Sequence, residues 1–254
     1  MQSIATAPFV RPAADRTPGT AACTARDAVA PWLGGDAGTR IRLGHTVAAT
    51  AERRLDAHQH LYLEGQKQSH VYVVLEGVVG LYKLVADGRR QIVSFAYPGD
   101  MIGLDCPHVH GDSAEALGAL RVRAIPLNAI DRLIASEPGF GQTLLAIAAE
   151  EIADTRERLV SLGRKSAAEK VAGFVLRLAR RNATLGRESG TVELPMKRSD
   201  IADFLGLTIE TVSRNITRLR AARVIRLVST CEIEILDPER LAAIAEGDED
   251  GRLH

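Results

Sequence analysis

The stretch from Lys197 to Arg226 constrains the fold of this chain most, because its pattern predicts two short amphipathic helices joined by a tight turn. Apolar residues within Ile201–Leu205 give the first helix one buried face, and Gly206 then interrupts the period. In the second helix the apolar residues recur at spacings of three and four, at Ile209, Val212, Ile216 and Leu219. This spacing is typical of a helix that buries a single face.

Residues that favour helix starts precede both predicted helices. Ser199 and Asp200 can cap the first helix, and Thr208 can cap the second. The stretch therefore predicts a helix-turn-helix, in which the first helix holds the second in the major groove of DNA.

The charge pattern of the same stretch favours DNA as the partner. Between Thr211 and Cys231 the chain has arginines and no carboxylate, although 32 basic residues balance 32 acidic residues overall. The arginines are Arg214, Arg218, Arg220, Arg223 and Arg226. Positive charge is thus concentrated where phosphates would lie. A solvated helix face is the simpler explanation of such a run, but here the turn, the caps and the charge coincide.

The whole chain has the composition of an ordinary globular protein. Its 254 residues, 46% hydrophobic and 25% charged, are enough for one to three compact domains. No apolar run is long enough to cross a bilayer, and the N-terminus lacks the pattern of a signal peptide. Cys23, Cys106 and Cys231 are far apart and odd in number, which argues against a disulfide framework. We expect a cytoplasmic protein without a membrane partner.

Short apolar runs separated by Gly, Asp and Pro extend from about Ile41 to Pro126. Asp87-Gly88 is a strong hairpin signal, and Pro98-Gly99-Asp100 marks another turn. The runs are Leu61–Leu63, Val71–Leu75, Val78–Leu84, Gln91–Ala96, Met101–Leu104 and Ala119–Ile125. Frequent short strands of this kind predict an antiparallel barrel or jelly roll.

A helical period follows, from about Phe140 to Gly163, a length of roughly 36 Å. Six of its residues recur at alternating spacings of three and four, as in the a/d seam of a coiled coil. This seam consists of Leu145, Ala148, Ile152, Thr155, Leu159 and Leu162. We expect the helix to be the axis of a homodimer. Packing against its own domain is the alternative.

The remaining elements complete an α+β fold. Ser166–Arg181 predicts another amphipathic helix, and the segments TVEL, VIRLV and CEIEIL predict strands that form a wing beside the helix-turn-helix. Asp237-Pro238 can start a last short helix. We expect a flexible leader (1–30), a jelly-roll domain (31–136), a dimerisation helix (137–163), a winged helix-turn-helix domain (164–245) and an acidic tail (246–254).

A jelly roll, a long dimer helix and a C-terminal winged helix, in this order, resemble the CRP/FNR family of bacterial transcription regulators. The resemblance covers nearly all of residues 40–245 and implies a cyclic-nucleotide-binding-like jelly roll. Within IETVSR, Glu210, Ser213 and Arg214 match the E-x-x-S-R signature of the FNR and FixK branch, which reads TTGAT-type half-sites. The CRP branch usually has an arginine before the glutamate and a glycine before the last arginine, where this chain has Ile209 and Ser213.

The chemistry of the signature residues agrees with a role in base reading. Arg214 can bond to O6 and N7 of guanine, Glu210 can accept from a base amine, and Ser213 can contact a neighbouring base. Other residues of the stretch are expected to contact the DNA backbone, namely Ser199, Thr208, Thr211, Thr217 and Arg218. The resemblance implies a homodimeric regulator, an activator that contacts RNA polymerase. It implies a TTGAT-N4-ATCAA-like palindrome and control of low-oxygen respiration or nitrogen-fixation genes.

The jelly-roll domain departs from the ligand-binding members of the family. Asp112 precedes Ser113 where the cyclic-nucleotide binders have an arginine, and a carboxylate there would repel phosphate. Arg123 stands where the iron-sulfur members have a barrel cysteine, and the three clustered N-terminal cysteines of those members are missing. The sequence therefore predicts a FixK-like protein without a cofactor.

One segment keeps a metal site open as an alternative. Cys106, His108 and His110, followed by Glu115, place possible ligands in one loop, and the His-x-His pattern faintly resembles a cupin metal site. Loop histidines on the surface are the simpler interpretation. A metal- or haem-sensing regulator of the same family and, more remotely, a metal-dependent jelly-roll enzyme are the alternatives to the cofactor-free regulator.

Overall fold

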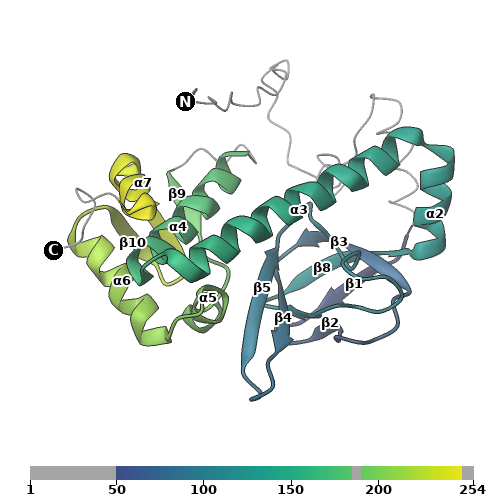
Figure 1. Ribbon diagram of the computed structural model, residues 1–254, viewed down its shortest axis with the longest axis horizontal. Coiled ribbons are helices and arrows are strands. Elements are labelled where there is room, and N and C mark those ends of the chain that lie inside the picture. Colours follow the sequence, from purple (N-terminus) through teal and green to yellow (C-terminus); the bar gives the residue numbers. More distant parts are fainter. Residues whose placement is uncertain (1–49, 185–189, 248–254) are drawn as a thin grey trace, which may run out of the picture.

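The computed structural model describes residues 50–184 and 190–247, so the expected leader lies outside the described residues, as does all but the start of the acidic tail. Two four-stranded antiparallel sheets form the predicted jelly roll (Figure 1). One sheet has the strand order β1-β8-β3-β6 and the other β2-β7-β4-β5. The strands are β1 (Glu52–Leu55), β2 (His60–Tyr62), β3 (His70–Glu76), β4 (Val79–Leu84), β5 (Arg90–Ala96), β6 (Met101–Ile102), β7 (Ser113–Ala116) and β8 (Leu120–Pro126).

Both turns predicted from Gly-containing signals are present in the barrel. The hairpin between β4 and β5 closes with a bond from the Val85 amide to the Arg89 carbonyl (3.0 Å), and Gly88 adopts a φ of +83°. At the second turn the Asp100 amide donates to the Tyr97 carbonyl at 2.9 Å. Positive φ is available to glycine at little cost, which explains why the sequence signals were reliable.

Two helices leave the barrel. Helix α2 (Leu127–Ser136) packs through Ile130 and Leu133 on the outer side of β3, where Val71 and Val73 are buried. Helix α3 (Pro138–Arg164) corresponds to the predicted long helix and crosses the molecule to the C-terminal part (Figure 1). None of the helices among residues 50–184 and 190–247 is both long and apolar enough to span a membrane.

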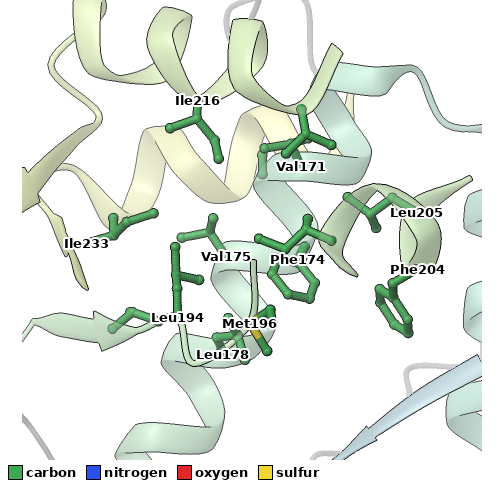
Figure 2. Close-up of a cluster of buried hydrophobic side chains, with 14 of the residues drawn as sticks. Val171, Phe174, Val175, Leu178, Leu194, Met196, Phe204, Leu205, Ile216 and Ile233 are labelled. Carbon is green, nitrogen blue, oxygen red and sulfur yellow. The ribbon is translucent and has the colours of Figure 1, made fainter. Parts of the chain in front are cut away.

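The C-terminal part is a winged helix-turn-helix. Its elements are α4 (Ala167–Thr184), β9 (Thr191–Glu193), α5 (Arg198–Leu205), α6 (Ile209–Ala221), β10 (Ile225–Ser229), β11 (Glu232–Ile235) and α7 (Pro238–Glu246). Phe174 and Val175 of α4 lie at the centre of its core, between Ile216 of α6 and Leu194 after β9 (Figure 2). The predicted cap of α7 is also found, because the Asp237 carboxylate accepts from the Arg240 amide at 2.9 Å.

Some predictions at element level were incomplete or wrong. Strands β1 and β7 and helix α2 were not predicted. The two strands are only four residues long and carry no clear period. Helix α2 does carry a helical period, at Leu127, Ile130 and Leu133, that the prediction left unused. Ser199 does not cap α5, since it lies inside the helix, whose N-cap is Lys197. Ile209 was expected on the buried face of α6 but is 48% exposed, because the first turn of this helix projects beyond the core.

Gly77, between β3 and β4, provides a test of the barrel packing. It has a φ of +82°, and a Cβ atom there would lie 2.3 Å from the Ala119 carbonyl oxygen. Gly88 has a φ of +83° with nothing within 4 Å, so Gly88→Ala isolates the conformational strain, about 1–2 kcal/mol. We expect Gly77→Ala to lower the free energy of unfolding in urea by roughly 2 kcal/mol more than Gly88→Ala. Equal losses would contradict the close approach.

Candidate nucleic-acid interface

Helix α6 separates a buried side from an exposed side. Val212, Ile216 and Leu219 are buried against the domain core, as the spacing predicted. The helix begins at its predicted cap, where the Thr208 hydroxyl accepts from the Thr211 amide at 3.2 Å. With one side fixed in the core, the opposite side of α6 must face outward.

The three predicted base-reading residues lie on this outer side. Glu210, Ser213 and Arg214 are all exposed, and spacings of three and four bring them to adjacent turns of the helix. The backbone amide of Glu210, the Thr208 hydroxyl and the charge of Arg214 hold the pKa of the Glu210 carboxyl below its usual value. At neutral pH the site therefore presents an acceptor beside a guanidinium donor, which is the combination needed to read base edges.

Helix α5 supports α6 through a short, well-defined turn. The Asp200 carboxylate accepts from the Lys197 amide at 2.9 Å and fixes the start of α5. Gly206 ends α5 in the left-handed conformation (φ +62°), and the Leu207 amide closes the turn on the Ala202 carbonyl at 3.0 Å. A left-handed residue at this position is a common way to end a helix, and glycine adopts it without strain.

The residues predicted to contact the DNA backbone differ in exposure. Thr208, Thr217 and Arg218 are exposed, whereas Ser199 and Thr211 are half-buried. The Thr217 hydroxyl donates to the Ser213 carbonyl at 2.9 Å, which leaves its oxygen free only as an acceptor towards water. Of these five residues, only Arg218 carries a positive charge, which phosphates attract.

The arginine cluster continues into the wing. All five arginines predicted from the charge pattern are exposed, and Arg226 on β10 forms an ion pair with Glu234 on β11.

Sequence reasoning missed Asn215, which is buried in α6 and donates its side-chain amide to the Thr211 carbonyl at 2.8 Å. Its polarity in an otherwise apolar position was the available signal.

Helix α3 exposes the residues of the predicted dimer seam. Leu145 and Leu159 are each 72% exposed and Ile152 is 52% exposed in the single chain. Ala148, Thr155 and Leu162 are exposed as well. Apolar residues gathered on one exposed side of a helix are uncommon on a protein surface, so the dimer seam stays a prediction that this exposure supports.

The jelly roll contains a small acidic pocket beneath α3. Asp112, Asp105 and Glu151 line its wall, and its volume is about 80 Å³, well below the several hundred Å³ of ordinary ligand sites. The Tyr62 hydroxyl donates to Asp112 at 3.4 Å. Burial raises the pKa of Asp112 to about 7, and the neighbouring carboxylates Asp105 and Glu151 act in the same direction.

The possible metal ligands Cys106, His108 and His110 do not converge. His108 is exposed, with a φ of +73°, whereas His110 is buried and its ring stacks on Tyr62 with the centroids 3.7 Å apart. The expectation that both histidines lie on the surface is thus wrong for His110. Glu115 is engaged elsewhere, by His58 and Arg90. Within the part of the chain that the structure describes, no three His, Cys, Asp or Glu side chains form a metal-binding group.

Comparisons with known proteins agree with this architecture. Residues 52–137 match the family model of the cyclic nucleotide-binding domain, and residues 169–244 match that of the Crp-like helix-turn-helix domain. Among solved structures, FixK2 from Bradyrhizobium japonicum is similar with a TM-score of 0.73 and 34% sequence identity. That similarity covers 77% of this chain and 97% of FixK2.

Two relatives similar in sequence are named as regulatory proteins. The nitrogen fixation regulation protein FixK of Bradyrhizobium diazoefficiens is 47% identical over 174 residues, which cover 68% of this chain and 73% of FixK. The transcriptional activatory protein AadR of Rhodopseudomonas palustris is 40% identical, over 76% of this chain and 80% of AadR. The chain therefore belongs to the CRP/FNR family, in its FNR/FixK branch, and is a transcription regulator rather than an enzyme.

Proposed function

We propose that two copies of this chain, paired through α3, read a TTGAT-N4-ATCAA-like palindrome and activate transcription. The observation that carries the proposal is the exposed set of Glu210, Ser213 and Arg214 on one side of α6. The exposed seam on α3 supplies the surface for pairing. A two-fold axis along α3 would set the two α6 helices about 34 Å apart, one turn of DNA.

The chemistry of each reading residue supports a defined base contact. The Arg214 fork matches the two major-groove acceptors of guanine, and the ionised Glu210 accepts from the exocyclic amine of cytosine or adenine. Ser213 lies between them and can approach a neighbouring base. Contacts from Arg218 and the wing arginines to phosphates would add affinity that is independent of sequence.

The relatives support a role as an activator in low-oxygen metabolism. Their names describe regulation of nitrogen fixation in FixK and transcriptional activation in AadR. We infer that this chain activates genes of anaerobic respiration or nitrogen fixation. Activation requires contact with RNA polymerase, for which barrel loops and the surface of the DNA-binding domain are available.

We infer further that the barrel does not bind a cyclic nucleotide. Asp112 lines the pocket beneath α3. Its carboxyl supplies no positive charge to pair with the phosphate of such a ligand, and its ionised form would repel that phosphate. Addition of cyclic AMP to the purified protein is thus expected to leave its melting temperature unchanged.

Arg214→Ala tests the base-reading assignment. Loss of the bidentate contact is expected to reduce discrimination by about 1–3 kcal/mol per half-site and to abolish the preference for the palindrome. Competition gel shifts with palindromic and scrambled DNA measure this preference. Arg218→Ala is the control, because loss of a phosphate contact weakens binding to both sequences alike and lowers the salt slope by about 1. Unchanged preference in Arg214→Ala would refute the assignment.

Ile152→Glu tests the dimer seam. A glutamate at this position would face its own copy across the two-fold axis, and burial of two like charges is strongly unfavourable. We expect the variant to be monomeric in analytical ultracentrifugation at micromolar concentration. Ala153→Glu adds the same charge to an exposed residue outside the seam and should remain dimeric. A dimeric Ile152→Glu protein would exclude α3 as the axis.

The pH dependence of stability in Asp112→Asn tests the raised pKa of Asp112 in the acidic pocket. The folded protein has a pKa of about 7 at Asp112, whereas an aspartate in the unfolded chain titrates near about 4. Between these values the folded state holds a proton that the unfolded state has released, so stability falls as pH rises. We expect Asp112→Asn to raise the melting temperature over wild type by a larger amount at pH 8 than at pH 5.

Asp87→Asn is the matched control for this measurement. Arg89 holds the pKa of the exposed Asp87 carboxyl below its usual range, so Asp87 is ionised throughout pH 5–8. Its melting-temperature difference from wild type should therefore be constant over that interval. A constant difference for Asp112→Asn as well would show that Asp112 is ionised in the fold.

A further inference from the structure

Arg90 of the barrel lies within an ionic network that reaches the helix-turn-helix. Its guanidinium Nη1 bonds to Glu115 of β7 at 2.8 Å, and its Nε bonds to Asp203 of α5 at 3.1 Å. The third nitrogen, Nη2, bonds to Asp200 at the start of α5. One side chain of β5 thus joins β7 to two residues of α5 that lie about one helical turn apart.

Further polar contacts surround this arginine. Glu115 also bonds to His58 Nδ1 at 2.7 Å, and His58 Nε2 lies 3.0 Å from Nζ of Lys197, the N-cap residue of α5. The Gln91 side chain, next to Arg90, donates to the Asp203 carbonyl. The barrel is therefore joined to the start and the body of α5 by Arg90, by His58 and by Gln91.

An apolar contact accompanies the network. Phe95 of β5 lies 5.0 Å from Phe204 of α5 and 6.2 Å from Phe174 of α4, measured between ring centroids. Burial of Phe95 stabilises the contact without defining its angle, since the hydrophobic effect has no direction. The planar guanidinium of Arg90 can bond to its carboxylates in only a narrow range of orientations, so it fixes the angle between β5 and α5.

The contact leaves the reading surface free. Helix α6 lies on the far side of α5 from the barrel, and Glu210, Ser213 and Arg214 remain exposed (Figure 1). An interaction with this placement orients α6 and does not cover it. Building on the proposed reading of a palindrome, we propose that Arg90 is a positioning residue that sets the angle of α6 for two half-sites to be read together.

The charges make Arg90 costly to lose but not essential for folding. Asp200 and Glu115 have side chains only 8% and 10% exposed, so removing Arg90 leaves two buried carboxylates without their shared cation. Its carboxylate partners outweigh the opposing effect of burial and raise the pKa of Arg90, which therefore stays charged. A second ion pair, Arg181 with Asp100 at 2.6 Å, and the Phe95 contact still hold barrel and α4 together.

The experiment compares Arg90→Ala with Arg89→Ala in the full-length protein. Arg89 is exposed and bonds to Asp87 of its own turn, so its removal takes the same charge from the same hairpin. Affinity is measured for three DNAs: the N4 palindrome, a duplex with one half-site scrambled, and a palindrome whose spacer is lengthened to N6. The angle between the two α6 helices affects binding only when both half-sites are read.

We expect Arg90→Ala to weaken binding to the N4 palindrome by about 2- to 30-fold, with little change on the single half-site. The preference of wild type for N4 over N6 should become smaller, because a loosely held α6 adapts to either spacing. Arg90→Lys keeps the charge without the fork and should give an intermediate result. Equal loss on all three DNAs, or a profile like that of Arg89→Ala, would overturn the proposal.

Hydrogen exchange of the DNA-free protein tests the same role independently of the palindrome. Arg90→Ala should speed exchange in β5 and α5 while the amides of α4 and α7 stay protected. Unchanged exchange in α5 would refute the positioning role. If wild type binds the palindrome no better than the single half-site, the proposed operator is wrong, and the exchange result alone decides the role of Arg90.

Discussion

Burial of Phe95 against Phe174 and Phe204 is the interaction on which the arrangement of this protein depends. Phe95 belongs to a barrel strand, yet its ring contributes to the core of the helix-turn-helix domain. The barrel and the helix-turn-helix domain consequently share one continuous apolar core, in addition to their covalent connection through α3. The polar bonds of Arg90 lie at the edge of this core, where they add direction to an otherwise non-directional contact.

The same shared core buries one side of α6 and leaves the other side exposed. Val212, Ile216 and Leu219 anchor α6 inward, which leaves Glu210, Ser213 and Arg214 exposed, as the proposed contact with bases requires. In the barrel, the carboxyl group of Asp112 lines the small pocket beneath α3. The relation of the barrel to the DNA-binding domain in this chain rests on these internal contacts.

Local patterns predicted the helices and turns, while long-range contacts escaped them. The caps Thr208 and Asp237 and the Asp87-Gly88 turn were readable because each acts within a few residues. The partners of Arg90 on α5 are 110 and 113 residues away in the chain, so no local pattern could reveal them. The burial of His110 was missed for the same reason, since this loop residue is buried by stacking on Tyr62 of β2, far from it in the chain.

Selection of bound sequences from a random DNA pool by the full-length protein tests the central claim most directly. Two inverted TTGAT half-sites separated by four base pairs should dominate the selected pool. The interval is expected to be fixed, because in the proposed dimer each α6 packs on α5, which contacts the barrel, and the two copies pair through α3. A pool enriched in single half-sites, in direct repeats or in half-sites at variable spacing would contradict a rigid two-fold reader.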